Sequence, residues 1–459
     1  ATNVTLDGLK IAPSGSLGER THFVDILDGS KNITIKNSEI AGPSGNYNGF
    51  GIYASESSNL VYQNNYGHHV TNGIANFQNS DIVLKGNVID HIGGDSFKFG
   101  GIDGGLIENN TGAAHINAPA GAHNDFMQFQ GTPSNDIVIR GNILLPANEA
   151  TTQGIFFNTS GSSDNILIEQ NIILAALLRG ISLEDPTNVT IRYNTVLDLP
   201  GVAGDPTKIL TNDSATVEHN IWTSYAGGTE GTNVVVQHDN ANDTNYLYDL
   251  FKDYQGVGTT LEGLMPVDGS SVDEKGAYAR LIELLTGEAP SVPTGSDPVE
   301  PETETPTTSP EPETTPDTST APETDDSGTN GDDAPEIWTP EASDNTSISG
   351  KTVSVSSASE LKAVLKAANG GETILLEAGD YGDLTITKDY ASEVTLKSAS
   401  PLKAELGFVD IVGATNVTLD GLKIAPSGSL GERTHFVDIL DGSKNITIKN
   451  SEIAGPSGN

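Results

Sequence analysis

The chain contains no cysteine, which excludes disulfide bonds, thiolate catalysis and cysteine-ligated zinc. Aromatic residues make up only 6% of its 459 residues, and no apolar run approaches the roughly 20 residues that a membrane-spanning helix needs. Basic residues are also scarce, with 23 Lys and Arg against 62 Asp and Glu, so the net charge is −39. Because such a chain would repel phosphates, we expect no nucleic acid partner. Because no apolar run is long enough, we expect no membrane span.

The two ends of the sequence repeat each other. Residues 1–46 recur without a single difference at 414–459. Homologous repeats normally diverge in sequence. An identical run of this length therefore favours the interpretation that the sequence covers slightly more than one unit of a tandem repeat. We expect the natural module to run from about Ser347 through 413 and on into residues 1–290, as one copy in a tandem array.

Residues 291–344 differ in composition from the rest of the chain. They contain ten prolines and fifteen Asp or Glu, with no Lys or Arg. Such a segment buries too little apolar surface to offset its ordering entropy, and its like charges repel. We interpret it as an acidic, extended linker between folded parts.

A short strand pattern recurs through residues 1–222. Segments such as DIVLKGN (81–87) and DIVIRGN (136–142) combine a turn-forming residue, alternating β-branched residues and a closing asparagine. The closing asparagines are separated by 22 to 32 residues and stand at positions 65, 87, 110, 142, 171, 194 and 220. This spacing predicts an all-β fold, a parallel β-helix in which the asparagines form a structural column from coil to coil.

Two segments are expected to close the ends of the stack. Residues 358–369 form the one clear amphipathic helix, with Ser357 or Ser359 as its N-cap, so 345–459 is interpreted as the amino-terminal cap and first coils. Residues 223–290 are less regular and contain a second expected helix at about 277–285. We expect them to close the carboxyl end, because open strand edges need covering.

A second strand of each coil carries its own pattern, in NGIAN (72–76), DSFKF (95–99), DFMQF (125–129), QGIFF (153–157) and RGISL (179–183). Its third and fifth positions are mostly apolar and should point inward, which leaves positions two and four to face solvent. The fourth positions would then form an outward row of Lys98, Gln128, Phe156 and Ser182. A polar row flanked by an aromatic ring suits a linear polysaccharide.

The densest polar segment of this face joins Asp95, Lys98, His123 and Asp125 with Gln128. Acting on a uronic acid polymer at C5 requires a base, a group that neutralises the adjacent carboxylate, and an acid. Lys98 or His123 is the candidate base. The competing structural interpretation is that the aspartates cap turns and the lysine is only solvated.

Two ways of neutralising the sugar carboxylate are open. Arg179 would make a bidentate contact, or Asp95 and Asp125 would bind calcium. Arg140 and Arg192 are further candidate cations for a basic groove. His68 and His69 are not expected to bind one metal ion, because adjacent strand residues point to opposite faces.

The cap SELKAVLKAANGGETILLEAGDYGDLTI, the coils NVTLDGLKI and NITIKNSEI, and the strand HNDFMQF resemble right-handed parallel β-helix proteins of the pectate-lyase superfamily. They are most similar to secreted bacterial proteins related to alginate lyases and mannuronan C5-epimerases, although the epimerases' Asp-Pro-His signature is absent. The resemblance covers everything except the linker. It implies the fold and an extracellular, secreted or cell-surface bacterial location, and it also extends to non-catalytic adhesins.

Two functions follow from the sequence. The first is a lyase or epimerase that acts on an acidic polysaccharide, and the second is a non-catalytic structural or adhesive module of a giant surface or filament protein. The duplicated ends also suggest self-association, in which caps swap or chains join head to tail.

Overall fold

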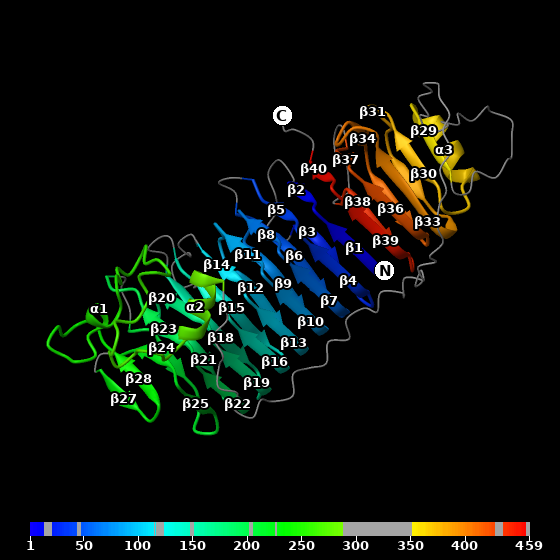
Figure 1. Ribbon diagram of the computed structural model, residues 1–459. Coiled ribbons are helices and arrows are strands. Elements are labelled where there is room, and N and C mark those ends of the chain that lie inside the picture. Colours follow the sequence, from blue (N-terminus) through cyan, green and yellow to red (C-terminus); the bar gives the residue numbers. More distant parts are fainter. Residues whose placement is uncertain are drawn as a thin grey trace, which may run out of the picture.

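The computed structural model describes residues 1–12, 21–43, 47–113, 115, 124–146, 151–201, 205–224, 227–287, 351–426 and 435–455. Over these ranges the chain is a right-handed parallel β-helix, as the strand pattern predicts. Successive coils stack into one elongated body (Figure 1), and a typical coil gives one strand to each of three sheets. No helix of the described ranges is long and apolar enough to cross a membrane. The linker at 291–344 lies outside these ranges.

The first sheet runs along the body from cap to tail. Its strands are parallel throughout, and in spatial order they are β29 (Thr352–Val355), β30 (Thr373–Leu376), β33 (Asp389–Ser398), β36 (Thr415–Asp420), β39 (Lys444–Lys449), β1 (Thr2–Asp7), β4 (Lys31–Lys36), β7 (Ser58–Gln63), β10 (Ser80–Lys85), β13 (Asp103–Glu108), β16 (Asn135–Arg140), β19 (Asp164–Glu169), β22 (Thr187–Arg192) and β25 (Thr216–Glu218). Its inward Ile, Leu and Val side chains fill the narrow core along the body.

The second sheet follows the first around each coil. Its strands, in the same direction along the body, are β31 (Gly379–Asp380), β34 (Ala404–Leu406), β37 (Lys423–Ile424), β40 (Glu452–Ala454), β2 (Lys10–Ala12), β5 (Glu39–Ala41), β8 (Tyr66–His68), β11 (Val88–Asp90), β14 (Thr111–Gly112), β17 (Ile143–Leu144), β20 (Ile172–Ala175), β23 (Thr195–Asp198), β26 (Ile221–Thr223), β28 (Asn233–Val236) and β27 (Gly228–Glu230). The last pair, β27 with β28, is antiparallel and ends the sheet.

The third sheet carries the outward row expected from the sequence. Its strands are β3 (His22–Ile26), β6 (Phe50–Ser55), β9 (Asn72–Phe77), β12 (Phe97–Gly100), β15 (Asn124–Gly131), β18 (Thr152–Thr159), β21 (Arg179–Leu183) and β24 (Lys208–Leu210). On the cap side, β32 (Leu384–Ile386), β35 (Val409–Val412) and β38 (Val437–Leu440) form a separate three-stranded sheet. Among the described residues, the strands of the sheet that holds the row all lie between His22 and Leu210.

The asparagine column lies at the turn between the first and second sheets and comprises Asn65, Asn87, Asn110, Asn142, Asn171, Asn194 and Asn220. Asn142 shows the repeated pattern: its backbone and side-chain amides both donate to Asn171 Oδ1, at 2.9 Å, and its Nδ2 also donates to the Ile107 carbonyl. The positive φ angle that the turn requires belongs to the preceding residue, for example Asn64 or Asn109, and not to the column itself. The column satisfies buried turn amides, so its role is structural.

The duplicated ends meet within the same chain. Strand β39 pairs with β1, and β40 pairs with β2, so residues 351–455 stack directly on residue 2 onward. The N and C ends accordingly lie part-way along the body in Figure 1. No described strand links β38 to β3 along the third wall, so these two strands belong to separate sheets. Within this chain the cap segment therefore joins the body at the strand that begins at Thr2.

Helices lie near both ends of the body. Helix α3 (Ala358–Ala367) is the cap helix expected from the sequence: Ser357 Oγ accepts from the Glu360 amide, and Leu361, Val364 and Leu365 are buried. At the far end lie α1 (Leu247–Leu250) and α2 (Tyr278–Thr286). Buried apolar residues of 247–281 pack against the outer face of β20, β23 and β26. Together, these residues and strands form a second hydrophobic core.

Candidate functional site

Four residues of the third sheet stand in register on successive coils. Lys98 pairs with Gln128, Gln128 with Phe156, and Phe156 with Ser182. Strands of one sheet are about 4.8 Å apart, so the outward row advances by that distance with each coil. The Lys98 side chain keeps an exposed fraction of 19%, but Gln128, Phe156 and Ser182 are buried, with exposed fractions of 8%, 4% and 4%. The expectation that the fourth position of each segment faces solvent is therefore wrong for these three residues.

The expectation that the second position of each segment faces solvent is wrong. Ser96 and Phe126, which hold that position, are fully buried, and Gly154 has no room for a Cβ because the Gly180 carbonyl oxygen would lie 2.0 Å away. In the segment of Lys98, the first position contacts the row instead, because the Asp95 carboxylate meets the Lys98 ammonium group. The chain bends before β12, so strict alternation does not hold there.

Asp95, Lys98 and Gln128 form a compact polar cluster. Lys98 Nζ lies 2.7 Å from Asp95 Oδ2 and 2.9 Å from Gln128 Oε1, and it donates a hydrogen bond to each. The exposed fraction is 19% for the lysine side chain and 5% for that of the aspartate. This is a charge pair removed from most of the solvent, so its attraction is stronger than that of an exposed pair.

The aspartate of this cluster is held by neighbouring coils. Asp95 Oδ1 accepts the backbone amide of Asp125 at 3.1 Å, and the Asp95 amide donates to Asn72 Oδ1 at 3.0 Å. Both carboxylate oxygens of Asp95 are thus engaged by protein donors. A calcium ion at Asp95 would have to displace Lys98, so the arrangement does not fit the calcium site suggested by the sequence.

Asp125 and Gln153 stand in register on β15 and β18. Both side chains are buried, with exposed fractions of 0% and 4%. They stand three positions before Gln128 and Phe156, near the start of their strands. Asp125 therefore supports the cluster through its backbone amide, while its carboxylate lies beneath the accessible surface.

A buried histidine supports the strand of the cluster from inside. His115 Nε2 lies 3.1 Å from Ser96 Oγ, and burial lowers the pKa of His115 to about 4. The ring is therefore neutral at neutral pH and serves as a hydrogen-bonding partner. The sequence analysis missed this role, and that of Asn72, because both depend on contacts between coils that no local motif marks.

Arg179 lies further along the row. Its guanidinium carbon is 4.6 Å from the centroid of the Phe156 ring, which is a cation–π contact. Phe156 is two coils from Lys98, which corresponds to about 10 Å along the axis. Arg179 and Lys98 therefore cannot hold one sugar carboxylate together, contrary to the expectation that they share a site.

Two other expected cations do not reach the row. Arg140 and Arg192 end strands of the first sheet, where their Nε atoms bind Glu108 Oε1 at 2.8 Å and Glu169 Oε2 at 2.9 Å. Both therefore belong to a different wall from Lys98, which lies on β12 of the third sheet. His123 lies outside the described residues, directly before Asn124, the first residue of β15.

The expectation that His68 and His69 point to opposite faces is also wrong. Their Nδ1 atoms are 2.7 Å apart, because His69 has a φ of 57° and turns the chain at the end of β8. Across the described ranges, no three His, Asp or Glu side chains are grouped so as to hold a metal ion.

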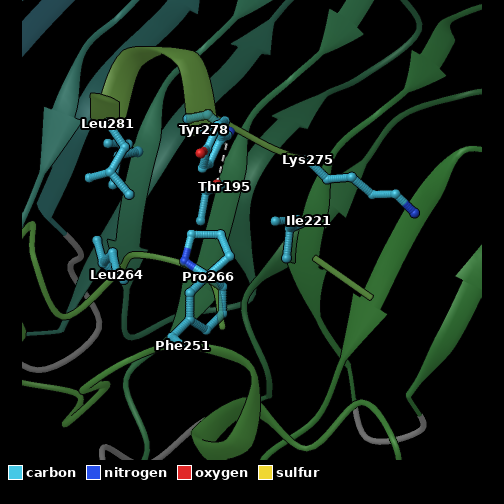
Figure 2. Close-up of a pocket in the computed structure, with 10 residues that line it drawn as sticks. Thr195, Ile221, Phe251, Leu264, Pro266, Lys275, Tyr278 and Leu281 are labelled. Carbon is cyan, nitrogen blue, oxygen red and sulfur yellow. Dashed lines mark hydrogen bonds between the residues drawn. The ribbon is translucent and has the colours of Figure 1, made fainter. Parts of the chain in front are cut away.

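Two hollows of the molecule do not coincide with the row. Figure 2 shows the first, a cavity of about 10 Å³ beneath α2 that is lined by Ile221, Phe251, Leu264 and Leu281. It holds about one water molecule. The second is an open hollow of about 570 Å³ at the turn from the third to the first sheet.

The comparison with protein families agrees with the fold. Residues 24–221 match the family described as "Right handed beta helix region". No curated protein matches the chain. Among solved structures, the PL6 family alginate lyase AlyGC is 12% identical with a TM-score of 0.22, over 99% of this chain and 78% of that one. A new PL6 alginate lyase in complex with a trisaccharide is 8% identical with a TM-score of 0.30, over 95% and 82%. Likeness at this level carries no argument about function, which has to come from the site.

Proposed function

We propose that this β-helix binds an acidic, uronic acid polysaccharide along the outer face of the third sheet and abstracts the C5 proton, as a lyase or a C5-epimerase. The cluster of Asp95, Lys98 and Gln128 carries the proposal, because it is a largely desolvated charged group on an outward row. We also propose that the protein works outside the cell, where such polymers occur.

The charges along the row suit a polyanion better than the protein as a whole does. Lys98 lies on the row and Arg179 lies beside it, over the ring of Phe156. Lys208 pairs with Arg179 in the next strand. On a chain of net charge −39, these cations provide a local region in which a carboxylate is attracted. Low exposure strengthens that attraction.

The contacts of Lys98 divide the chemical roles. An ammonium group that donates to Asp95 and Gln128 is a cation, and a cation cannot accept the C5 proton. We therefore assign Lys98 to the sugar carboxylate, where it stabilises the charge that develops when C5 loses its proton. His123 is then the candidate base, adjacent in sequence to the first residue of β15.

In the lyase reaction, the base takes the C5 proton and the electron pair of the C5–H bond forms the C4=C5 double bond. The C4–O bond breaks, and the leaving oxygen takes a proton from an acid. In the epimerase reaction, the proton returns to C5 from the opposite face. Gln128, Phe156 and Ser182 line the path of the chain, and Arg179 serves a carboxylate two to three sugars from the one at Lys98.

The test is ultraviolet absorbance with a panel of uronic acid polymers, with and without calcium. β-Elimination gives an absorbing unsaturated uronide, and NMR of the same samples detects C5 inversion. We expect activity that Lys98→Met and His123→Ala abolish, that Lys98→Arg retains in part, and that does not need calcium. Equal loss in Lys98→Arg and Lys98→Met would make Lys98 the base, and inactivity on every polymer would contradict the proposal.

A second function is favoured by one observation, the stacking of identical coils. Strands β36 and β39 of one copy are followed in the sheet by β1 and β4 of the other, and Val417 and Val4 both pair with Ile446 in the same register. A rigid strut assembled from such copies would need no catalysis. Small-angle scattering should show that a chain with one further copy of residues 414–459 is longer by about two coils, or roughly 10 Å.

A further inference from the structure

The row that carries Lys98 continues toward the cap with aromatic side chains. Lys98 pairs with Ala75 on β9, and Ala75 pairs with Tyr53 on β6. Tyr53 in turn pairs with Asp25 on β3. Phe77 stands two positions after Ala75 on β9, so its side chain points to the same face of the sheet. The outward face of these coils therefore presents two aromatic rings, those of Tyr53 and Phe77.

The Tyr53 ring is held by aromatic neighbours. The His22 imidazole is stacked on it, with ring centroids 4.2 Å apart and an interplanar angle of 10°. Phe50 meets the Tyr53 ring edge-on at 5.7 Å, and Phe77 lies at 5.7 Å with a tilt of 37°. His22 Nδ1 lies 3.1 Å from Asp25 Oδ2, which holds the imidazole in turn. Rings fixed in this way lose little freedom when a ligand binds.

The aromatic surface reaches the strand of Lys98. Gly100 on β12 pairs with Phe77, and a Cβ at Gly100 would lie only 3.0 Å from Phe77 Cδ1. The absence of a side chain there makes room for the Phe77 ring. Ala75 is fully buried, so the larger side chains around it close over this position. The surface is therefore continuous from Tyr53 to Lys98.

This end of the row is more open to solvent than the other end. The rings of Phe50, Tyr53 and Phe77 are half-buried, whereas the row residues on the tail side of Lys98 are buried. Leu27, which follows the last residue of β3, is 51% exposed. Apolar side chains that are exposed together on one face mark an interaction site more often than scattered ones do.

We propose that Tyr53 and Phe77 form a subsite that stacks on an uncharged pyranose ring of the polymer whose uronate is held at Lys98. The inference rests on the proposed function of this wall. Tyr53 is two coils from Lys98, or about 10 Å along the axis, which is about the length of two sugar units. The substrate that fits is a heteropolysaccharide in which a neutral sugar stands two units from a uronate.

The charges around the two rings favour an uncharged sugar. Burial, and then the charges of Asp25 and Asp28, raise the pKa of the Tyr53 hydroxyl, so both carboxylates act at this ring. A sugar carboxylate would be repelled here. Sugar hydroxyls can instead donate to carboxylates such as the exposed Asp28, which already accepts from Ser55 Oγ at 3.2 Å. The apolar C–H face of a pyranose can pack on the aromatic rings.

The experiment is a titration of the full chain, followed by saturation-transfer NMR, with two uncharged tetrasaccharides, cellotetraose and β-1,4-galactotetraose. Tetrasaccharides of mannuronic acid and of galacturonic acid are titrated beside them. We expect at least one uncharged sugar to bind at millimolar concentration. Tyr53→Ala should weaken that binding by at least about 5-fold, and Tyr53→Phe should retain it. Lys98→Met should weaken only the binding of the uronic acid sugars.

The matched control is Tyr193→Ala. Tyr193 is also half-buried and also stacks on a histidine, His219, at 5.0 Å, but it follows β22 of the first sheet. This variant should bind all four sugars as the wild type does. Circular dichroism shows whether each variant is folded, and Phe77→Ala answers the same question if Tyr53→Ala does not fold.

The outcomes separate this subsite from the proposed chemistry. Failure of the wild type to bind either uncharged sugar, or equal affinity in Tyr53→Ala and Phe77→Ala, would overturn the subsite. An equal loss of uronic acid binding in Tyr53→Ala would overturn its preference for an uncharged ring. Binding of an uncharged sugar that depends on Tyr53, in a chain without activity on any polymer, would support the subsite and contradict only the chemistry.

Discussion

The asparagine column and the outward row both run along this molecule, and they differ in whether the same residue recurs from coil to coil. The asparagine column repeats one residue on coil after coil, and each amide binds the next, as Asn110 binds Asn142 and Asn142 binds Asn171. The outward row changes residue at every coil, from Lys98 to Gln128 to Phe156 to Ser182. Repetition is what a stacked backbone needs, whereas variation serves something outside the chain.

The difference also appears in what each column does for stability. The asparagines satisfy turn amides that would otherwise be buried without partners. Lys98 binds only side chains at the surface of the wall, and replacing a buried ion pair by apolar groups is often neutral for stability. We therefore expect substitutions in the two columns to separate stability from activity.

The largest effect is expected on activity from Lys98→Met. Loss of a charged group at the reacting carboxylate should reduce the rate on uronic acid polymers by about 10²–10³-fold. Lys98→Met alone leaves the Asp95 carboxylate buried without its cation, so the free energy of unfolding in urea should also fall by about 3 kcal/mol, and adding Asp95→Asn should restore most of that loss. A loss of stability that Asp95→Asn does not relieve would instead place Lys98 among the structural residues.

The next effect is on stability, from Asn142→Ala. It removes the Nδ2 donor and leaves the Asn110 backbone and side-chain amides without their acceptor. Each buried donor without a partner costs about 1–3 kcal/mol, so we expect a loss of about 3 kcal/mol in urea unfolding. Activity per folded molecule should be retained, and a large loss of rate at unchanged stability would contradict the structural role.

A pH effect is expected from His115, beneath the row. Its pKa is lowered to about 4 in the folded state, so the unfolded chain binds the proton first. Stability from this residue is therefore complete above the unfolded pKa of about 6.5 and falls as the pH is lowered toward 4. His115→Gln should lose less stability than wild type between pH 7 and 4.5, and identical pH profiles would contradict this assignment.

The smallest effect is expected at an exposed asparagine. Asn59 Nδ2 donates to Asn32 Oδ1 at 3.0 Å in a solvent-exposed ladder, and its φ is 58°. Glycine accepts that conformation, and water replaces the hydrogen bond, so Asn59→Gly should change stability by less than about 0.5 kcal/mol. A cost as large as that of Asn142→Ala would mean that burial does not distinguish the two ladders.

The sequence predicts the fold because each coil repeats the same local solution. Each strand, each turn that ends in a column asparagine and the Ser357-capped helix can be recognised from a few consecutive residues. The alignment of Lys98, Gln128, Phe156 and Ser182 follows from the same repeat.

What the sequence does not predict depends on departures from strict alternation or on contacts between coils. The bend before β12 brings Asp95 to Lys98 and buries Ser96, and the left-handed His69 brings two imidazoles together. The separation of Arg179 from Lys98 becomes clear only once coils are counted along the axis. The direct stacking of β39 on β1 likewise required the assembled coils.

The most direct test of the proposed function is a crystal structure of the His123→Ala chain soaked with a uronic acid hexasaccharide. We predict that the sugar chain lies along the third sheet, with one carboxylate at Lys98 and another near Arg179. A hexasaccharide bound on another face, or no bound sugar at concentrations that saturate the active protein, would contradict it.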